Sequence, residues 1–248
     1  MNTFAYEVHH PELLTLRAAA LLASITTMAM GARNVAHVAF SGGATPRALF
    51  KLLATSEWQS RIPWARTHIW WVDERCVPPG DPESNFGMAQ ALLLRHLPVM
   101  ITHRIRGEEH PWQAAYLYER ELVTGFNLWA GALPRFDLIF LGVGPDGHIA
   151  SLFPGSAAVA EQKHRVTVDN APAPPHARVS LTLPVINHAR NIIFMATGAN
   201  KGPIIKQLFY TDSDLPAARV RPTHGHLLWL LDEALQKAAS LPLLHQCQ

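Results

Sequence analysis

Short apolar runs bounded by turn residues recur along the chain and predict β-strands. Between several of these runs, leucine and alanine repeat at the spacing of a helix that buries one face. The predicted strands are 35–40, 68–72, 136–143, 179–183 and 191–197. The predicted helices are leucine-rich turns after Pro46 and after Ser84, together with 114–129 and 227–235.

Strands that alternate with helices favour a parallel sheet covered by helices, because each parallel connection must cross back over the sheet. The sequence therefore predicts an α/β fold, a three-layer α/β/α arrangement with a mostly parallel sheet. Residues 171–175, APAPP, are interpreted as a loop within a single domain that spans 1–248. In open sheets of this type, ligands bind beyond the carboxyl ends of the strands. Polar residues just after the strands are therefore the candidate functional residues.

Composition predicts a folded core and argues against several classes of function. Of 248 residues, 48% are hydrophobic and 16% are charged, and the formal net charge is +2. The lysines and arginines form no block of the kind that follows a nucleic-acid backbone, so no nucleic-acid partner is expected. Cys76 and Cys247 lie far apart and form no C-x-x-C pair, which argues against a disulfide framework or a zinc site.

Residues 18–32, AAALLASITTMAMGA, carry no charge and resemble a signal-peptide core or a membrane span. The run is shorter than the roughly 20 residues that cross a bilayer. Glu7 and Glu12 precede it and the first basic residue is Arg17, unlike the positively charged start of an export signal. We therefore expect a helix packed in the core of a cytoplasmic protein that has no membrane partner.

Four clusters of glycine or polar residues follow the predicted strands. The first, SGGATPR, contains Ser41, Gly42, Gly43, Thr45 and Arg47. Its glycines let the backbone approach a ligand, Thr45 can cap a helix, and the proline suits the first helical position. Free N–H groups at a helix start favour an anion such as phosphate. A tight turn without a ligand is the alternative interpretation.

The second cluster, Asp73-Glu74-Arg75, places consecutive charges at the end of the strand 68–72. In extended backbone, Asp73 and Arg75 point to one side and Glu74 points to the other. Asp73 and Arg75 are therefore the candidate site residues. An ion pair at the sheet edge, without a functional role, is the alternative.

The third cluster is the most specific of the four. The apolar strand 136–141 runs into GVGPDGH, which places Asp146 and His148 in a glycine-rich loop. Histidine has the side-chain pKa nearest physiological pH, which suits a group that takes and then returns a proton. Asp146 is close enough in sequence to hold the imidazole in one tautomer. A purely structural role for His148 is the alternative.

The fourth cluster, TGANK, places Lys201 near a helix start, where the helix dipole disfavours a cation unless an anion is bound beside it. Lys201 is therefore a candidate phosphate ligand. Arg178, at the start of the strand 179–183, is a second candidate, although a solvated surface arginine is equally consistent with the sequence. His224 and His226 could border the site, but a surface loop is the favoured interpretation.

Together these motifs resemble the 6-phosphogluconolactonase family. The resemblance runs in order through SGGATPRALF, WWVDERCVPPGDPESNFG, FDLIFLGVGPDGHIASLFPG, RVSLTLPVIN, TGANK and LLWLLDEAL, which cover nearly the whole chain. It implies a fold related to glucosamine-6-phosphate deaminases, with no metal and no organic cofactor. It also implies a small-molecule substrate, 6-phospho-D-glucono-1,5-lactone, which is hydrolysed to 6-phosphogluconate in the oxidative pentose phosphate pathway.

The resemblance implies roles for particular residues. By position, His148 matches the catalytic histidine, with Asp73 and Arg75 beside it. His148 can take a proton from the water that attacks C1 and return it to the leaving ring oxygen. Backbone N–H groups or Arg75 would stabilise the oxyanion, and Asp73 or Asp146 would orient the imidazole. The positions around the phosphate and the sugar hydroxyls are matched by Ser41, Gly42, Gly43, Thr45, Arg178 and Lys201.

Two other functions fit part of the pattern. Glucosamine-6-phosphate deaminases share the strand-end aspartate and the DGH sequence, but they carry Asn-Glu-Pro where this chain has Leu152-Phe153-Pro154. A phenylalanine cannot transfer a proton. A non-catalytic sugar-phosphate sensor would need the phosphate loop alone, whereas this chain also keeps His148 and Asp73. Both a monomer and a weak homodimer are consistent with the sequence.

Overall fold

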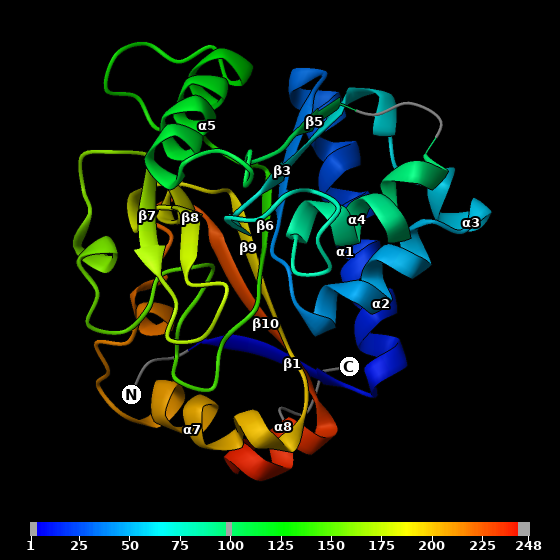
Figure 1. Ribbon diagram of the computed structural model, residues 1–248. Coiled ribbons are helices and arrows are strands. Elements are labelled where there is room, and N and C mark those ends of the chain that lie inside the picture. The colour runs from blue at the N-terminus through cyan, green and yellow to red at the C-terminus, as the bar shows by residue number, and fades with distance from the viewer. Residues whose placement is uncertain (1–3, 98–100, 243–248) are drawn as a thin grey trace.

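The computed structural model describes residues 4–97 and 101–242, and its central element is a seven-stranded sheet (Figure 1). The strands lie in the order β1-β10-β9-β6-β2-β3-β5, and every neighbouring pair is parallel. The predicted α/β fold with a mostly parallel sheet is therefore confirmed. The strands are β1 Ala5–His9, β2 Ala36–Phe40, β3 Thr67–Trp71, β5 Ile101–His103, β6 Leu138–Leu141, β9 Asn191–Ala196 and β10 His226–Asp232.

Helices cover both faces of this sheet. Figure 1 shows α1, α2 and α4 on one side and α5 on the other, while α7 and α8 pack together beside β10 and β1. The helices are α1 Pro11–Arg33, α2 Ala44–Leu53, α3 Ser56–Gln59, α4 Asn85–Leu92, α5 Pro111–Gly125, α6 Leu183–Asn187, α7 Gly202–Tyr210 and α8 Glu233–Ala239. Short 3-10 helices lie at Trp64–Arg66, Leu94–His96, Ala157–Ala160, Ala199–Lys201 and Pro216–Arg219.

A second, smaller sheet lies beside α5. It contains β4 Asp73–Arg75, β8 Ala177–Leu181 and β7 Val166–Asn170, paired antiparallel in that order. The strand predicted at 179–183 therefore belongs to this sheet and not to the parallel one. Because a single residue, Val72, separates β3 from β4, the chain turns out of the main sheet immediately after β3.

The helix predicted at 227–235 is wrong, because His226–Asp232 form β10 and helix α8 begins only at Glu233. Strand β10 is paired on both sides, and its centre, Trp229 to Leu231, is buried. A strand buried on both faces is apolar at successive positions, so its spacing does not distinguish it from a buried helix. Strands β1, β5 and β7 were not predicted, because they lie at sheet edges and carry a weaker apolar signal.

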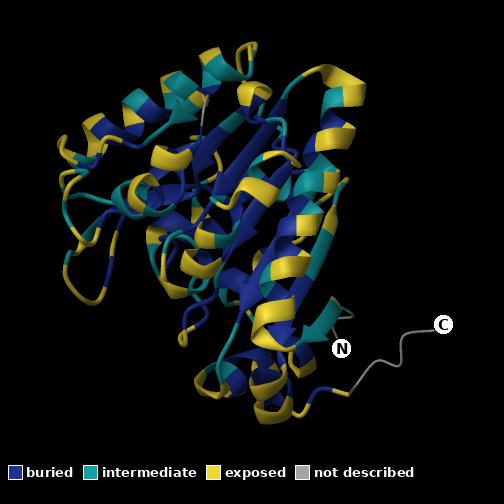
Figure 2. Ribbon diagram, turned by 90° about the vertical axis from the view of Figure 1, so that its right-hand side faces the viewer, coloured by how far each residue is buried: buried dark blue, intermediate teal, exposed yellow. Residues whose placement is uncertain are grey.

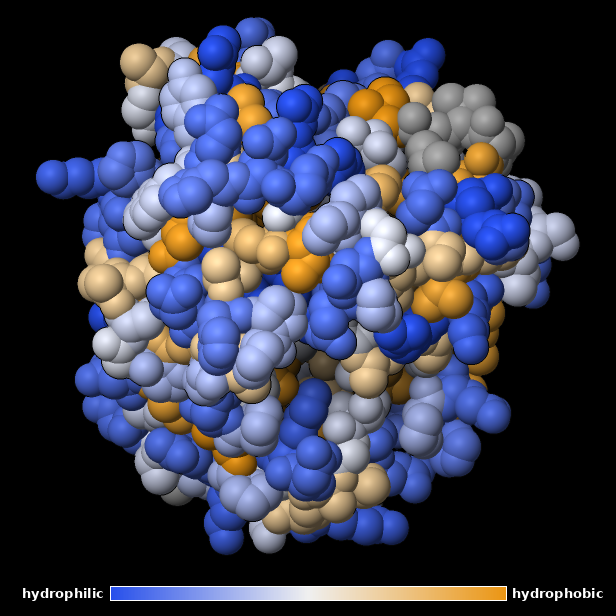
Figure 3. Space-filling model, viewed as in Figure 1, coloured by the Kyte–Doolittle hydropathy of each residue, from blue (hydrophilic) through white to orange (hydrophobic). Residues whose placement is uncertain are grey.

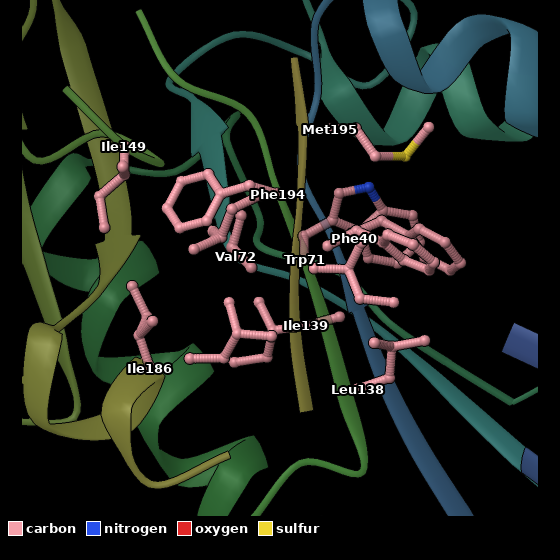
Figure 4. Close-up of a cluster of buried hydrophobic side chains, with 14 of the residues drawn as sticks. Phe40, Trp71, Val72, Leu138, Ile139, Ile149, Ile186, Phe194 and Met195 are labelled. Carbon is pink, nitrogen blue, oxygen red and sulfur yellow. The ribbon is translucent and has the colours of Figure 1, made fainter. Parts of the chain in front are cut away.

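The core lies on both faces of the main sheet. In Figure 4, Phe194 lies with Ile149 and Ile186 on one side of β9, and Met195 lies with Trp71 on the other. All five side chains are buried. Figure 2 shows the strands buried beneath helices whose outer faces are exposed, and hydrophilic residues cover most of the face in Figure 3.

Helix α1 is long and apolar enough, by length and composition alone, to cross a membrane. In the structure one side of the helix packs against the sheet, where it contacts β1, β2 and β10. Its buried residues recur three or four positions apart, as expected for a helix with one packed face. The predicted packed helix over 18–32 is therefore confirmed. The buried residues are Leu14, Ala18, Ala19, Leu22, Thr26 and Ala29.

Imidazole and aromatic rings pack together on the face of the sheet that carries α5. The Trp70 Nε1 donates a hydrogen bond to His37 Nδ1 at 3.2 Å, and the His37 ring stacks on Phe126 with centroids 4.0 Å apart. Burial lowers the pKa of His37 to about 3, and the neighbouring imidazole of His68 acts in the same direction. His37 is therefore neutral in the folded protein at physiological pH.

We predict that His37→Asn makes stability less dependent on pH in mild acid. The unfolded chain protonates His37 near pH 6.5, whereas the folded protein resists protonation down to about pH 3. The contribution of neutral His37 to the free energy of unfolding is therefore complete above pH 6.5 and is lost as the pH falls toward 3. The loss is at most about 1.4 kcal/mol per pH unit, and an asparagine oxygen can still accept from Trp70.

The measurement is urea unfolding at about pH 7.5 and about pH 5. The unfolding free energy of the wild type should fall more between these values than that of His37→Asn. His96→Asn, which changes an exposed histidine, should behave as the wild type does. Equal losses in wild type and His37→Asn would contradict the prediction.

Candidate active site

A cavity lies where the strand order of the main sheet reverses direction. From β2 the chain adds β3 and β5 on one side, and it later adds β6, β9 and β10 on the other. The ligand crevice of an open α/β sheet lies beyond the carboxyl ends of the strands at such a switch point. The cavity has a volume of about 170 Å³. The predicted site residues that line it are Ser41, Gly42, Gly43, Thr45, Asp73, Arg75, His148 and Lys201.

The loop after β6 holds His148 against Asp146. Asp146 Oδ1 lies 2.6 Å from His148 Nδ1 and also accepts from the His148 backbone N–H at 3.2 Å. Since the carboxylate can only accept, Nδ1 carries the proton, and Nε2 has no hydrogen-bond partner among the described residues. A Cβ on Gly144 would lie 2.2 Å from the imidazole, so this position requires glycine. The pair therefore presents Nε2 as a proton acceptor.

Asp73 is the buried carboxylate of the cavity and is 6% exposed. Its Oδ2 accepts from Ser151 Oγ at 2.7 Å, and its backbone carbonyl accepts from Asn85 Nδ2 at 2.9 Å. Burial raises the pKa of Asp73, although the Ser151 hydrogen bond and the charge of Arg75 oppose the shift. Asp73 is not hydrogen-bonded to His148, so Asp146 is the aspartate that contacts the imidazole.

Glu74 points away from the cavity, as the strand alternation predicts, and caps helix α4. Its carboxylate accepts from the backbone N–H groups of Asn85 at 2.7 Å and Phe86 at 2.8 Å. Burial raises the pKa of Glu74, while these backbone hydrogen bonds oppose the shift. The cap fixes Asn85 in the cavity wall, where a Cβ on Gly42 would lie 1.7 Å from Asn85 Oδ1.

Asn85 and Ser151 were not predicted as site residues, although each is 1% exposed and contacts Asp73. The Asn85 Oδ1 atom is buried without a hydrogen-bond partner. Their only sequence signal is a polar residue next to a motif, in ESNFG and in GHIAS. That signal does not reveal that the tertiary structure places both beside one carboxylate.

Two of the predicted basic residues lie on neighbouring strands of the small sheet. Arg75 on β4 lies opposite Arg178 on the neighbouring antiparallel strand β8. Arg75 Nη1 donates a hydrogen bond to the backbone carbonyl of Glu83 at 2.5 Å. Arg178 is 8% exposed and does not line the cavity. Burial lowers the pKa of Arg178, and the charge of Arg75 adds to this effect. Two adjacent guanidinium groups favour a bound anion, because it relieves their mutual repulsion.

Lys201 also lines the cavity, in front of helix α7. Burial lowers the pKa of Lys201, while the charge of Asp232 opposes the shift. Asp232 accepts from the Gly198 N–H at 2.9 Å and from the Leu235 N–H at 2.8 Å. Both of its carboxylate oxygens thus bind backbone N–H groups and not Lys201. The lysine is therefore available to an anion in the cavity.

The loop after β2 differs in three details from the prediction, the first being that its proline is the third residue of helix α2 and not the first. Helix α2 begins at Ala44 after Gly43, whose φ is +97°, and no side chain caps it. Thr45 lies inside the helix and does not cap it, because the glycine turn already occupies the cap position. Arg47 is exposed and does not line the cavity, since it lies one turn further along the helix. The uncapped helix start lines the cavity.

His224 and His226 lie away from this cavity. His226 begins β10, at the amino end of the sheet, whereas the cavity lies at the carboxyl end. Both histidines line a different cavity. Among the described residues, no group of three or more His, Cys, Asp or Glu side chains is arranged to hold a metal ion. The site thus combines a proton acceptor, a buried carboxylate, cations and an uncapped helix start.

Sequence comparisons identify related proteins. The family model of glucosamine-6-phosphate isomerases/6-phosphogluconolactonase matches residues 9–229. A 6-phosphogluconolactonase from Haemophilus influenzae is 39% identical over 205 residues, which cover 80% of this chain and 85% of that protein. The GDH/6PGL endoplasmic bifunctional protein of Homo sapiens is 40% identical over 209 residues, covering 79% of this chain and 25% of that protein. The chain thus matches about a quarter of that longer relative.

Solved structures agree with the sequence comparison. A 6-phosphogluconolactonase structure from Trypanosoma brucei has a TM-score of 0.86 at 25% identity, covering 98% of this chain and 100% of that one. A monomeric glucosamine-6-phosphate deaminase of the NagB superfamily has a TM-score of 0.78 at 19% identity, covering 96% and 100%. The second likeness shows the fold alone. It confirms the predicted relation of this fold to the deaminases.

We predict that Asp73→Asn stabilises the protein at neutral pH. The folded state favours protonated Asp73. The contribution of this carboxyl to the free energy of unfolding is therefore complete below the unfolded pKa near 3.8, and it is lost as the pH rises through the raised folded pKa. Asparagine is neutral throughout and nearly the same shape. We expect Tm to rise by a few degrees at about pH 7.5, since about 1 kcal/mol corresponds to about 2–4 °C at this chain length.

The gain in Tm should shrink at about pH 4, because protonation of the buried wild-type carboxyl reduces the cost of burying its charge. Asp212→Asn provides the control, because Asp212 is exposed, and it should leave Tm unchanged. A lower Tm for Asp73→Asn at neutral pH would show that the hydrogen bond from Ser151 outweighs the cost of burying the charge.

Proposed function

The chain belongs to the glucosamine-6-phosphate isomerase/6-phosphogluconolactonase family, and on this premise we propose that it hydrolyses 6-phospho-D-glucono-1,5-lactone to 6-phosphogluconate in the oxidative pentose phosphate pathway. The observation that carries the proposal is the position of His148. Its Nδ1 is bound to Asp146 and its Nε2 is free, in the wall of a cavity that also contains Arg75 and Lys201. The names of the relatives support this activity.

The proposed reaction needs one group that takes and returns a proton. Water attacks C1 of the lactone while His148 Nε2 removes its proton, and the carbonyl electrons move onto the oxygen. As the C1–O bond of the ring breaks, His148 gives this proton to the leaving ring oxygen, so that the acid and a free hydroxyl result. General acid–base catalysis of this kind is typically worth about 10²–10⁴-fold.

The carboxylates of the site favour the charged imidazole during this cycle. Asp146 Oδ1 accepts a hydrogen bond that becomes an ion pair once His148 is protonated. The buried Asp73 also interacts with His148 through charge, although the two are not hydrogen-bonded. The oxyanion is proposed to be stabilised by Arg75 or by backbone N–H groups of the cavity wall. These steps need neither a metal nor an organic cofactor.

The rest of the cavity is suited to bind the sugar phosphate. We assign the phosphate to the part of the cavity that is lined by Lys201 and the start of α2, and Arg75 adds positive charge to the same cavity. An anion there would offset the burial of these cations. The unpaired Oδ1 of Asn85 is an acceptor that a sugar hydroxyl would satisfy. Leaving such an atom unpaired is costly, so the bound hydroxyl contributes both affinity and orientation.

Phe153 argues against the deaminase reaction. Its ring centroid lies 4.9 Å from that of His148, at the position where the deaminases carry their glutamate. A phenyl ring supplies no carboxylate for ring opening. The ionisable groups beside the imidazole are thus the aspartates. This fits lactone hydrolysis, in which His148 alone takes and returns the proton.

We predict that His148→Ala lowers kcat for lactone hydrolysis by about two orders of magnitude or more, because the proton carrier is lost. The assay measures acid release from freshly generated 6-phosphogluconolactone, corrected for spontaneous hydrolysis. Binding of 6-phosphogluconate should be retained, since the cations remain.

His164→Ala is the matched control for this substitution. His164 is also a histidine whose Nδ1 lies beside a carboxylate, that of Glu161 at 3.3 Å, but it lies outside the cavity. It should keep wild-type kcat. A His148→Ala enzyme as fast as the wild type would refute the acid–base role, and a wild type no faster than background would refute the lactonase activity.

We predict that Lys201→Gln raises KM by about tenfold or more with a smaller change in kcat. A lysine that contacts the phosphate binds substrate and transition state alike, and a charge-assisted hydrogen bond is worth about 1.5–3 kcal/mol. The control is Lys206→Gln on the exposed side of the same helix α7. A fall in kcat at unchanged KM would place Lys201 at the reacting carbon instead.

A further inference from the structure

A second cavity lies at the opposite end of the main sheet. It has a volume of about 350 Å³ and is bordered by the end of α1 and by residues that precede or begin β6, β9 and β10. Three arginines enter its wall, Arg33, Arg135 and Arg190, and the one acidic residue that lines it is Asp137. Strand β6 starts beside this cavity and ends at the proposed active site. Its four residues span about 13 Å, so one small ligand cannot fill both cavities.

The single carboxylate of this cavity is already engaged. Asp137 Oδ1 accepts from Arg33 Nη2 at 2.5 Å and lies 3.3 Å from Arg190 Nε, while Oδ2 accepts from the His37 backbone N–H at 2.9 Å. Asp137 is 2% exposed, so its position is fixed by the fold. One negative charge is therefore shared by two arginines, and a third arginine stands beside them.

Arg135 has no carboxylate partner among the described residues. Its Nη2 donates to the backbone carbonyl of His224 at 2.9 Å, which orients the guanidinium without neutralising it. The cavity thus has two more arginines than carboxylates. His224 and His226 also line it, and neither adds a negative charge.

Two Nε–H donors of this arginine cluster are buried and make no hydrogen bond, although Arg190 Nε lies within ion-pair distance of Asp137. The Nε atoms of Arg135 and Arg190 are inaccessible to solvent and have no hydrogen-bond partner in the structure. Burial lowers the pKa of Arg190, and the charges of Arg33 and Arg135 add to the effect. A buried donor left unpaired is unfavourable, and so are three guanidinium groups held together. An anion in the cavity would offset the repulsion among the three guanidinium groups.

We propose that this second cavity binds a phosphorylated small molecule, with its phosphate on the three guanidinium groups. Arginine binds phosphate through two parallel hydrogen bonds, which a single carboxylate cannot provide for three arginines at once. Ile25, Met28 and Ala29 on α1 give the same cavity an apolar part. A ligand that joins a phosphate to an apolar group would contact both the arginines and this apolar part. The site is independent of the proposed lactonase reaction.

The test measures binding of inorganic pyrophosphate by calorimetry to the wild type and to Arg135→Gln/Arg190→Gln. We expect the double variant to lose the binding event, or to weaken it by at least about tenfold, which corresponds to about 1.4 kcal/mol. Lys201→Gln is measured in parallel, because it removes only binding at the proposed active site. ADP as a second probe distinguishes the two sources of phosphate: tighter binding than pyrophosphate indicates an organic phosphate, and equal binding indicates an inorganic one.

A second variant keeps the test valid if the double variant does not fold. Met28 is 71% exposed, so Met28→Glu should fold normally while it places a carboxylate at the edge of the cavity. It should weaken pyrophosphate binding, whereas Met28→Gln and Leu16→Glu, elsewhere on α1, should not. Unchanged pyrophosphate binding in a folded Arg135→Gln/Arg190→Gln protein, or in Met28→Glu, would overturn the proposal, as would a wild type that binds pyrophosphate only at the Lys201 site.

Discussion

The parallel pairing of β2 with β6 is the constraint on which the proposed active site depends. The strands added after β2 extend the sheet on one side, and those added after β6 extend it on the other. The loops that follow β2 and β6 therefore run in opposite directions, which leaves a cavity between them. The hydrogen bond from Ser41 Oγ to the Phe140 carbonyl, 3.0 Å long and buried, joins the two strand ends at this point. It holds the uncapped start of α2 beside the loop of His148. The small antiparallel sheet then adds Asp73 and Arg75 from a third direction.

The site is assembled at a cost to stability. Asp73 and Glu74 are adjacent buried carboxyls whose pKa values burial raises, and burial lowers the pKa of Lys201. The charged form of each of these groups has a higher free energy in the folded protein than it would have in water. Glu74 recovers part of this cost through the N–H groups of α4. Asp73 and Lys201 have fewer partners, which supports their proposed contact with a ligand.

The sequence was most informative where local rules decide the structure. Alternating apolar runs and helical spacing predict the parallel fold, and strand-end position alone brings Asp73 and His148 to one cavity. The sequence was least informative where contacts between distant segments determine the secondary structure of a run or the surroundings of a residue. The run that forms β10 has the same apolar pattern as a buried helix, the contacts of Asn85 and Ser151 with Asp73 join distant segments, and the exposure of Arg47 depends on where α2 begins. Spacing carries no information on these contacts.

We propose that one cavity binds the sugar phosphate and places C1 at His148. A crystal structure with 6-phosphogluconate bound provides the test. We expect the C1 carboxylate within hydrogen-bond distance of His148 Nε2, with the phosphate on the side of Lys201 and the start of α2. A phosphate beside His148, or a ligand that leaves this cavity empty, would contradict it.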